Sequence, residues 1–234
     1  MGRVSGKTFR KILIALLLFA SCFWWGRIGR EVFFSSQYSQ PNFILDAGHG
    51  GEDGGAVSLT GGKESDINLS IVLHIEQMLG LLGNNPLLLR SEDISLHDEE
   101  AVTLREKKVS DLKNRVKAVN EIADATLISI HQNTYPEAKY KGAQVFYAPT
   151  GGSKELAQEI QQALKQHIQP DNTRQVKQIP DNVYLMNQIE NRAILVECGF
   201  LSNPDEEQLL RQDEYQQKVA LVVATSLCDV IAPK

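Results

Sequence analysis

The sequence predicts a single α/β domain over residues 42–232, in which helices flank a mostly parallel, twisted sheet. Two observations carry this prediction. Short apolar runs rich in β-branched residues alternate with helix-length segments whose apolar residues recur every three or four positions. The composition, with 42% hydrophobic and 23% charged residues, is that of a folded domain, and it excludes a disordered, collagen-like or polytopic membrane protein.

The domain begins with a strand and a glycine-rich loop. Residues 43–46 predict the strand, and residues 48–62 form the loop. A helix capped by Ser65 or Asp66 then follows, and the Asn-Asn-Pro sequence before the next strand ends it. The apolar positions of this helix are Ile67, Ile71, Ile75, Met78 and Leu82. A second strand is predicted at 87–89.

The middle of the domain continues the alternation. One face of a long amphipathic helix is marked by Val102, Val109, Leu112, Val116, Val119 and Ala123. Residues 127–130 predict a strand that ends at His131, and residues 143–147 predict another strand.

The last part of the domain adds one strand between helices. The helix before it carries Ala157, Ile160, Leu164 and Ile168 at helical spacing. Residues 193–196 predict a strand that ends at Glu197. Two helices, roughly 204–212 and 214–231, are predicted to close the chain.

Charge is distributed unevenly along the chain. Residues 1–40 hold six of the 24 basic residues and one of the 29 acidic residues, which gives this segment a charge of +5. Residues 41–234 therefore hold 18 basic and 28 acidic residues, a charge of -10 within the total of -5. An acidic body argues against a nucleic-acid partner, because phosphate binding needs clustered Lys and Arg.

Residues 1–30 predict a signal peptide or a short membrane anchor. Fifteen uncharged residues separate Lys11 from Arg27, and a helix of that length rises only about 22 Å against a hydrocarbon core of roughly 30 Å. The basic flanks can snorkel, so an anchor stays open beside a cleaved signal, with a buried core helix as the third alternative. The first two readings export the body to the outer face of the membrane or to the cell wall. Residues 31–41 predict a linker.

The three cysteines predict no disulfide framework. Cys22 lies in the apolar N-terminal segment, and Cys198 and Cys228 are expected to be small buried residues. A bridge between the last two is the less favoured alternative.

Four side chains suited to metal binding or catalysis are predicted to meet at one edge of the sheet. His49 follows the first strand, and Glu64 ends the glycine-rich loop. His131 and Glu197 each stand at the end of a strand. The carboxyl ends of parallel strands line the crevice where α/β sheets bind ligands. Two histidines and a carboxylate that leave one position open make a catalytic zinc site.

Each of these residues also has a structural explanation. A histidine after a strand is most often packed or hydrogen-bonded, and Glu64 near a helix start interacts favourably with the helix dipole. Glu197 is harder to explain in this way, because a carboxylate after four apolar residues is costly to bury without a partner. Asp46 or Ser129 is expected to hydrogen-bond one of the ligands. The remaining histidines look structural or solvated, and they are His74, His97 and His167.

The glycine-rich loop does not fit a phosphate site. It lacks the third glycine of a dinucleotide fingerprint and the Gly-Lys-Ser/Thr ending of a P-loop. Glu52 and Asp53 inside the loop would repel phosphate. The glycines are instead expected to allow positive φ angles and close backbone approach around His49.

Four segments, in this order, resemble the zinc N-acetylmuramoyl-L-alanine amidases of the amidase_3 type. They are DAGHGG at 46–51, ESDINL at 64–69, SIHQN at 129–133 and LVECGFLSNP at 195–204. The resemblance covers residues 42–232. Ala47, where the family usually has proline, and the substitutions Gln132 and Thr134 around the second histidine leave the metal positions untouched.

The resemblance implies one Zn²⁺ per chain, with His49, Glu64 and His131 as metal ligands and Glu197 as the catalytic carboxylate. It also implies a fold like that of the zinc exopeptidases and phosphorylase/hydrolase-like enzymes. The implied reaction is hydrolysis of the amide bond between N-acetylmuramic acid and L-alanine in peptidoglycan. Substrate-binding residues, a need for an accessory protein and the oligomeric state stay open.

Within that family, the sequence looks most like the germination-specific amidases of spore-forming bacteria. The segments that carry this narrower likeness are 112–117, 172–174 and 183–187. It implies action in the forespore intermembrane space, where stem peptides are removed from spore cortex before muramic-δ-lactam is formed. The alternatives are a vegetative cell-wall amidase in cell separation or lysis, a zinc exopeptidase, and a catalytically inactive peptidoglycan-binding module.

Overall fold

The computed structural model describes residues 43–231. The predicted signal peptide or anchor at 1–30, the predicted linker at 31–41 and Cys22 lie outside the described residues. Within the described range, no helix combines the length and the apolar character needed to cross a membrane.

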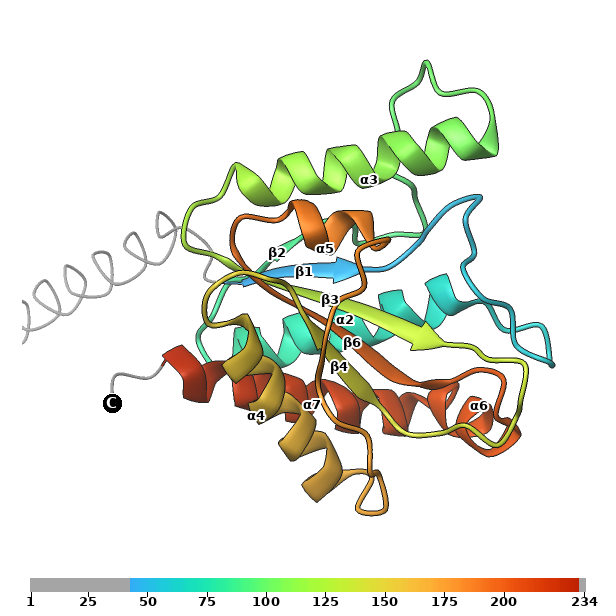
Figure 1. Cartoon of the computed structure of the whole chain (residues 1–234), viewed down its shortest axis with the longest axis vertical. Coiled ribbons are helices and arrows are strands. Elements are labelled where there is room, and N and C mark those ends of the chain that lie inside the picture. Colours follow the sequence, from blue (N-terminus) through green and yellow to red (C-terminus); the bar gives the residue numbers. More distant parts are fainter. Residues whose placement is uncertain (1–42, 232–234) are drawn as a thin grey trace, which may run out of the picture. The chain divides into compact units, whose positions relative to one another are not determined.

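A six-stranded sheet forms the centre of the described chain (Figure 1). In spatial order its strands are β2 (Leu87–Leu88), β1 (Phe43–Ala47), β3 (Thr126–Asn133), β6 (Arg192–Phe200), β4 (Gln144–Tyr147) and β5 (Lys177–Gln178). All neighbouring strands run parallel except β4 and β6, which are antiparallel. The predicted α/β fold with a mostly parallel sheet is therefore confirmed.

Helices cover both faces of the sheet (Figure 1). One face carries α2 (Glu64–Leu81), α4 (Ser153–His167), α6 (Pro204–Leu210) and α7 (Asp213–Ile231). The other face carries α3 (Leu104–Asn120) and α5 (Tyr184–Gln188). Successive residues of the central strands join opposite cores: Ile128 packs toward α2, whereas Leu127 packs toward α3. Because both faces are covered, the central strands consist almost entirely of buried residues.

The N-cap of the first helix lies two residues before Ser65, the nearer of its two predicted caps. Lys63 is the N-cap of α2 and makes no side-chain capping bond, so the assignment to Ser65 or Asp66 was wrong. The reason lies in the loop: the amide of Glu64 donates to the carbonyl of Ala56 at 2.8 Å, and that of Ser65 donates to Gly54 at 3.1 Å. Loop carbonyls thus satisfy the free amides of the first turn, and no capping side chain is needed.

Strands β3 and β6 continue past the residues that were expected to end them. β3 extends to Asn133 and β6 extends to Phe200, because the two strands keep pairing with His131 directly opposite Glu197. Both side chains are consequently fixed by the sheet rather than carried on a loop.

Helix α3 buries a polar face that apolar periodicity does not reveal. Val102, which precedes the helix, is 79% exposed and Val109 is 46% exposed, contrary to their predicted place on the apolar face. Asp111 and Arg115 are buried instead, together with Val119. The short elements β5 and α5, at two and five residues, carry too little periodicity to have been predicted.

The two cysteines of the described range are free thiols. Cys198 is buried, as expected, whereas Cys228 is only half-buried. The alternative of a bridge between them is therefore excluded by the structure.

Arg115 joins α3 to the end of β1 through buried ion pairs. Its guanidinium donates to Asp46 and, at 2.7 Å, to Asp111, and Arg115 itself is 2% exposed. The same group donates to the carbonyl of Ala47 at 3.0 Å and to that of His49 at 2.8 Å. Each of these acceptors loses one of its hydrogen bonds if the guanidinium is removed.

Replacing Arg115 with alanine should lower the free energy of unfolding by about 3–5 kcal/mol, because Asp46 would stay buried without a counter-charge. Urea denaturation followed by circular dichroism measures this loss. The matched control is Lys117→Ala on the same helix, whose ion pair with Glu121 spans 4.0 Å between exposed side chains and should change stability by less than about 0.5 kcal/mol. Equal stability losses in both variants would contradict the importance of the buried pair.

Candidate metal centre

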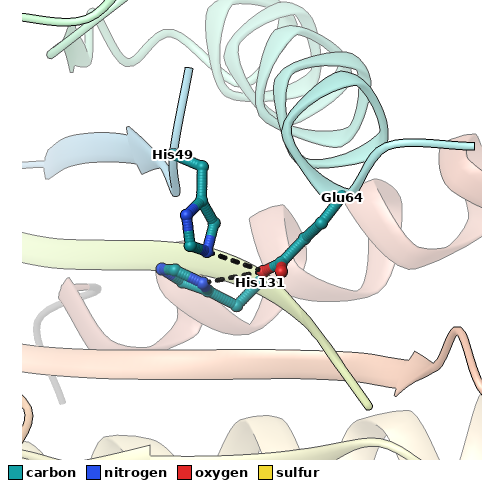
Figure 2. A group of neighbouring side chains, drawn as sticks. All are labelled: His49, Glu64 and His131. Atoms are coloured by element: carbon teal, nitrogen blue, oxygen red, sulfur yellow. Dashed lines mark hydrogen bonds and ion pairs between the residues drawn. The ribbon is translucent and has the colours of Figure 1, made fainter. Parts of the chain in front are cut away.

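Three of the four predicted site residues form one cluster of donor atoms at the carboxyl edge of the sheet (Figure 2). One donor atom each from His49, Glu64 and His131 lies within 4.8 Å of the others. The Oε1 atom of Glu64 lies 3.3 Å from Nε2 of His49 and 3.0 Å from Nδ1 of His131. Two imidazole nitrogens and one carboxylate oxygen at these separations could hold a metal ion.

The backbone turns sharply at His49 to direct its ring toward Glu64. The φ angle of His49 is 64°, in the left-handed region that non-glycine residues seldom occupy, and Gly50 and Gly51 follow with φ angles of 134° and 60°. Such a conformation persists only where its surroundings hold it in place. The predicted positive φ angles of the loop are confirmed, and they extend to the histidine itself.

Two hydrogen bonds fix the ring of His49. Its Nδ1 bonds to Oδ2 of Asp53 at 3.0 Å, which leaves Nε2 facing Glu64. Burial lowers the pKa of His49, but the hydrogen bonds to Asp53 and Glu64 outweigh that effect and raise its pKa to about 9. Asp53 thus has a positioning role that the sequence did not indicate.

A second buried arginine holds the backbone on the other side of this loop. Arg90 is 2% exposed, and it donates to the carbonyl of Ala47 at 2.8 Å and to that of Gly48 at 3.1 Å. It also donates to the carbonyl of Ser65 at 2.9 Å, which links the loop to the first turn of α2. The loop that carries His49 is therefore held between Arg90 and Arg115.

The carboxylate of Glu64 is anchored by backbone amides as well as by the imidazoles. Its Oε2 accepts a hydrogen bond from the amide of Ala56 at 2.9 Å, and its Oε1 accepts one from the amide of Gln132 at 3.1 Å. Burial alone would raise the pKa of Glu64, but hydrogen bonds with His131 and His49 hold it well below its ordinary value. Glu64 is therefore an ionised carboxylate held in one orientation.

The ring of His131 lies directly against the backbone of Gly48. A Cβ atom at Gly48 would come within 2.2 Å of Cε1 of His131, so a side chain at position 48 would displace the ring. The close backbone approach expected for the loop is thus present at Gly48.

Glu197 lies next to this cluster and has a buried oxygen without a hydrogen bond. It pairs with His131 across β3 and β6 and with Gln144 across β6 and β4, so the three side chains project from the same face of the sheet. Within residues 43–231, its Oε2 atom has no hydrogen-bond partner. Burial raises the pKa of Glu197 to about 7, and the nearby Glu64 adds to that rise against the opposing charge of His131.

In the described part of the chain, neither Asp46 nor Ser129 forms a hydrogen bond with His49 or His131. The hydroxyl of Ser129 donates to Asp46, whose other oxygen pairs with Arg115. The expectation that either residue would hydrogen-bond a ligand was wrong, because Asp46 is engaged by Arg115. His74 and His97 lie outside the cluster: His74 bonds to Asp213 at 2.9 Å, and His97 bonds to Ser95 at 2.9 Å.

The fold and the site together define a class of protein. A largely parallel α/β sheet brings two imidazoles and a carboxylate beside a second carboxylate, one oxygen of which has no hydrogen-bond partner among residues 43–231. These groups are typical of a hydrolytic enzyme with a metal-binding donor set. The model of the Amidase_3 family, described as N-acetylmuramoyl-L-alanine amidase, matches residues 43–229. The chain belongs to this family of peptidoglycan amidases.

Named relatives agree with the family. The Germination-specific N-acetylmuramoyl-L-alanine amidase of Bacillus subtilis (strain 168) is 38% identical over 179 residues, which cover 75% of this chain and 73% of the relative. The amidase LytC of the same strain is 29% identical over 77% of this chain and 33% of its own length. Among solved structures, the CwlD amidase from Clostridioides difficile in complex with the GerS lipoprotein has a TM-score of 0.78 and 38% identity, covering 83% of this chain and 99% of that one.

Proposed function

We propose that the protein uses a single Zn²⁺ ion, held by His49, Glu64 and His131, to hydrolyse the amide bond between the lactyl group of N-acetylmuramic acid and L-alanine. The observation that carries this proposal is the cluster of two imidazole nitrogens and one carboxylate oxygen within 4.8 Å. This donor set fits zinc, which takes nitrogen and oxygen ligands and in catalytic sites keeps its fourth position open for water or substrate.

The residues around the donor cluster have separate roles in this proposed reaction. When bound, zinc supplies an activated water molecule and polarises the amide carbonyl. Glu197 accepts the proton of that water and later delivers a proton to the departing amine of L-alanine. Burial raises the pKa of Glu197 to about 7 in the protein alone, and a pKa near the working pH favours proton transfer in both directions. Asp53 holds Nδ1 of His49, so that Nε2 stays directed at the donor cluster.

The biological setting in this proposal is spore germination. A relative named as germination-specific is 38% identical to this chain. The reaction would remove stem peptides from cortex muramic acid, and a deacetylase would then complete muramic-δ-lactam. The predicted export segment at 1–30 would place the enzyme outside the cytoplasm, where peptidoglycan lies. Since the CwlD structure contains the GerS lipoprotein, a lipoprotein is the kind of accessory partner we propose for this chain.

A vegetative role in cell separation or lysis is the second candidate, because LytC, which is also similar to this chain, is named as an amidase without a germination role. Spores of a strain that lacks the gene distinguish the two roles. We expect their cortex to lose muramic-δ-lactam and to retain its stem peptides, as measured by muropeptide chromatography. Complementation with the wild-type gene should restore the lactam. Normal lactam content together with chained vegetative cells would contradict the germination role and support the second candidate.

A further inference from the structure

Arg174 is a half-buried cation that forms no ion pair with any acidic side chain of residues 43–231. It lies in the segment between α4 and β5. Its Nε and Nη2 atoms donate to Oε1 of Gln144 at 3.1 and 2.7 Å. The centre of its guanidinium group lies 4.8 Å from the centroid of the Phe200 ring. The group is thus held by one neutral amide and one aromatic ring.

The position of Arg174 is fixed on the side of the sheet that carries Glu197. Gln144 lies directly opposite Glu197 in the antiparallel pair of β4 and β6, so both side chains project from the same face. The positive charge of Arg174 is close enough to act on Glu197. It also acts on Glu206, but that carboxylate already accepts hydrogen bonds from the amides of Gly142 and Phe200 at 2.8 Å each.

The segment that carries Arg174 is tied to β4 by several hydrogen bonds. The Asn172 side chain accepts from the amide of Arg174 at 2.9 Å and donates to the carbonyl of Ala143 at 2.8 Å. Gln144 in turn donates to the carbonyl of Gln175 at 2.7 Å. The guanidinium is therefore ordered before any ligand arrives, which reduces the entropy lost on binding.

A planar cation held only by neutral groups suits an anionic ligand. A guanidinium matches a carboxylate with paired N–H donors, and such charge-assisted bonds are roughly twice as strong as neutral ones. In a muramyl peptide, the carboxyl group of the first stem residue is consumed by its peptide bond. The second stem residue is a glutamate that continues the stem through its γ-carboxyl group, so its α-carboxylate is the first free one beyond the scissile amide, only about 7 Å of extended chain farther on.

We infer that Arg174 binds the free α-carboxylate of the second stem residue and makes the enzyme selective for stems in which that group is not amidated. This inference rests on the proposed function, because it assumes that the scissile amide lies beside Glu197 and the donor cluster. Arg174 is then a specificity-determining residue.

The test uses two synthetic muramyl dipeptides that differ only at this group, a free acid in one and a primary amide in the other. Wild-type enzyme should prefer the acid by about 10- to 100-fold in kcat/KM. In Arg174→Gln the ratio of kcat/KM for the acid to kcat/KM for the amide should fall to about one. In Arg174→Lys this ratio should be intermediate, because lysine keeps the positive charge but lacks the paired N–H donors of a guanidinium. Arg192→Gln is the matched control: this half-buried arginine at the amino end of β6 donates to Thr126 at 3.0 Å.

Several results would overturn the inference. One is equal cleavage of acid and amide by the wild type. Another is an Arg174→Gln variant, with wild-type thermal stability, that loses activity equally on both substrates and shifts the acid limb of the kcat profile; Arg174 would then act on Glu197 and not on the substrate. If wild-type, zinc-loaded enzyme cleaves neither dipeptide nor intact peptidoglycan, the proposed amidase function itself fails. Cleavage without selectivity defeats only the inference about Arg174.

Discussion

Replacing Glu197 with alanine should abolish amide hydrolysis while about one zinc ion per chain remains bound, because the three donors of the cluster are untouched. Loss of a general base costs about 10²- to 10⁴-fold in rate, and here the same group also serves the leaving amine. The release of new amino termini from purified peptidoglycan measures the activity. Metal analysis of the dialysed variant measures the zinc content. A variant with activity within about tenfold of wild type would contradict the role of Glu197.

The pH profile gives an independent test of the same group. Only the ionised carboxylate accepts a proton, so kcat should fall as pH drops through the pKa of Glu197. That pKa is raised to about 7 in the protein alone, and a bound cation would lower it. The acid limb should therefore lie at or below pH 7 in the zinc-loaded enzyme. Glu197→Gln keeps the size of the side chain, and it should lack this limb in whatever activity remains.

Replacing His131 with alanine should remove both the metal and the activity. The ring supplies one of the three donor atoms. Loss of a residue that only supports a metal ligand lowers metal affinity by roughly 10- to 100-fold. Loss of the ligand itself should therefore lower the affinity for zinc by more than that. Competition with a chromogenic chelator measures the affinity. Chelated wild-type protein should reproduce the inactive state and should recover with added zinc, whereas the variant should not recover.

The matched control for His131 is His74→Ala. His74 is also half-buried and hydrogen-bonded to a carboxylate, Asp213 at 2.9 Å, but it lies outside the donor cluster. This variant should keep zinc and activity. If His131→Ala bound zinc with wild-type affinity, the cluster would not be the metal site.

The meeting of His49, His131 and Glu197 at one edge of the sheet was predictable from a topological rule. Parallel strands of one α/β sheet place their carboxyl ends together, so His49, His131 and Glu197 could be expected to meet although they lie far apart in the sequence. The structure brings the first two together with Glu64 and places Glu197 beside His131. The four sequence segments that resemble the amidase family then identified which side chains at this edge were the candidate metal ligands and the candidate catalytic carboxylate.

The supporting residues were not predictable from local pattern. Asp53, Arg90 and Arg115 act through contacts with backbone groups and side chains whose positions exist only in the folded chain. Periodicity even misplaced the inner face of α3, where Val109 is exposed and Arg115 is buried. Hydrophobic pattern finds surfaces that exclude water, and it has no signal for a buried ion pair.

The simultaneous contacts of Arg115 with Asp46 and with the backbone of His49 have a further consequence. One guanidinium joins Asp46, at the end of the first strand, to the carbonyl of the residue that carries the first imidazole. Opening of the loop at 48–51 would break the hydrogen bonds that Arg115 donates to the carbonyl of His49 and that Arg90 donates to the carbonyl of Gly48, so these two buried side chains oppose local opening. The conformational entropy of assembling the donor cluster is consequently lost during folding, so a ligand of the cluster would meet side chains that are already in place.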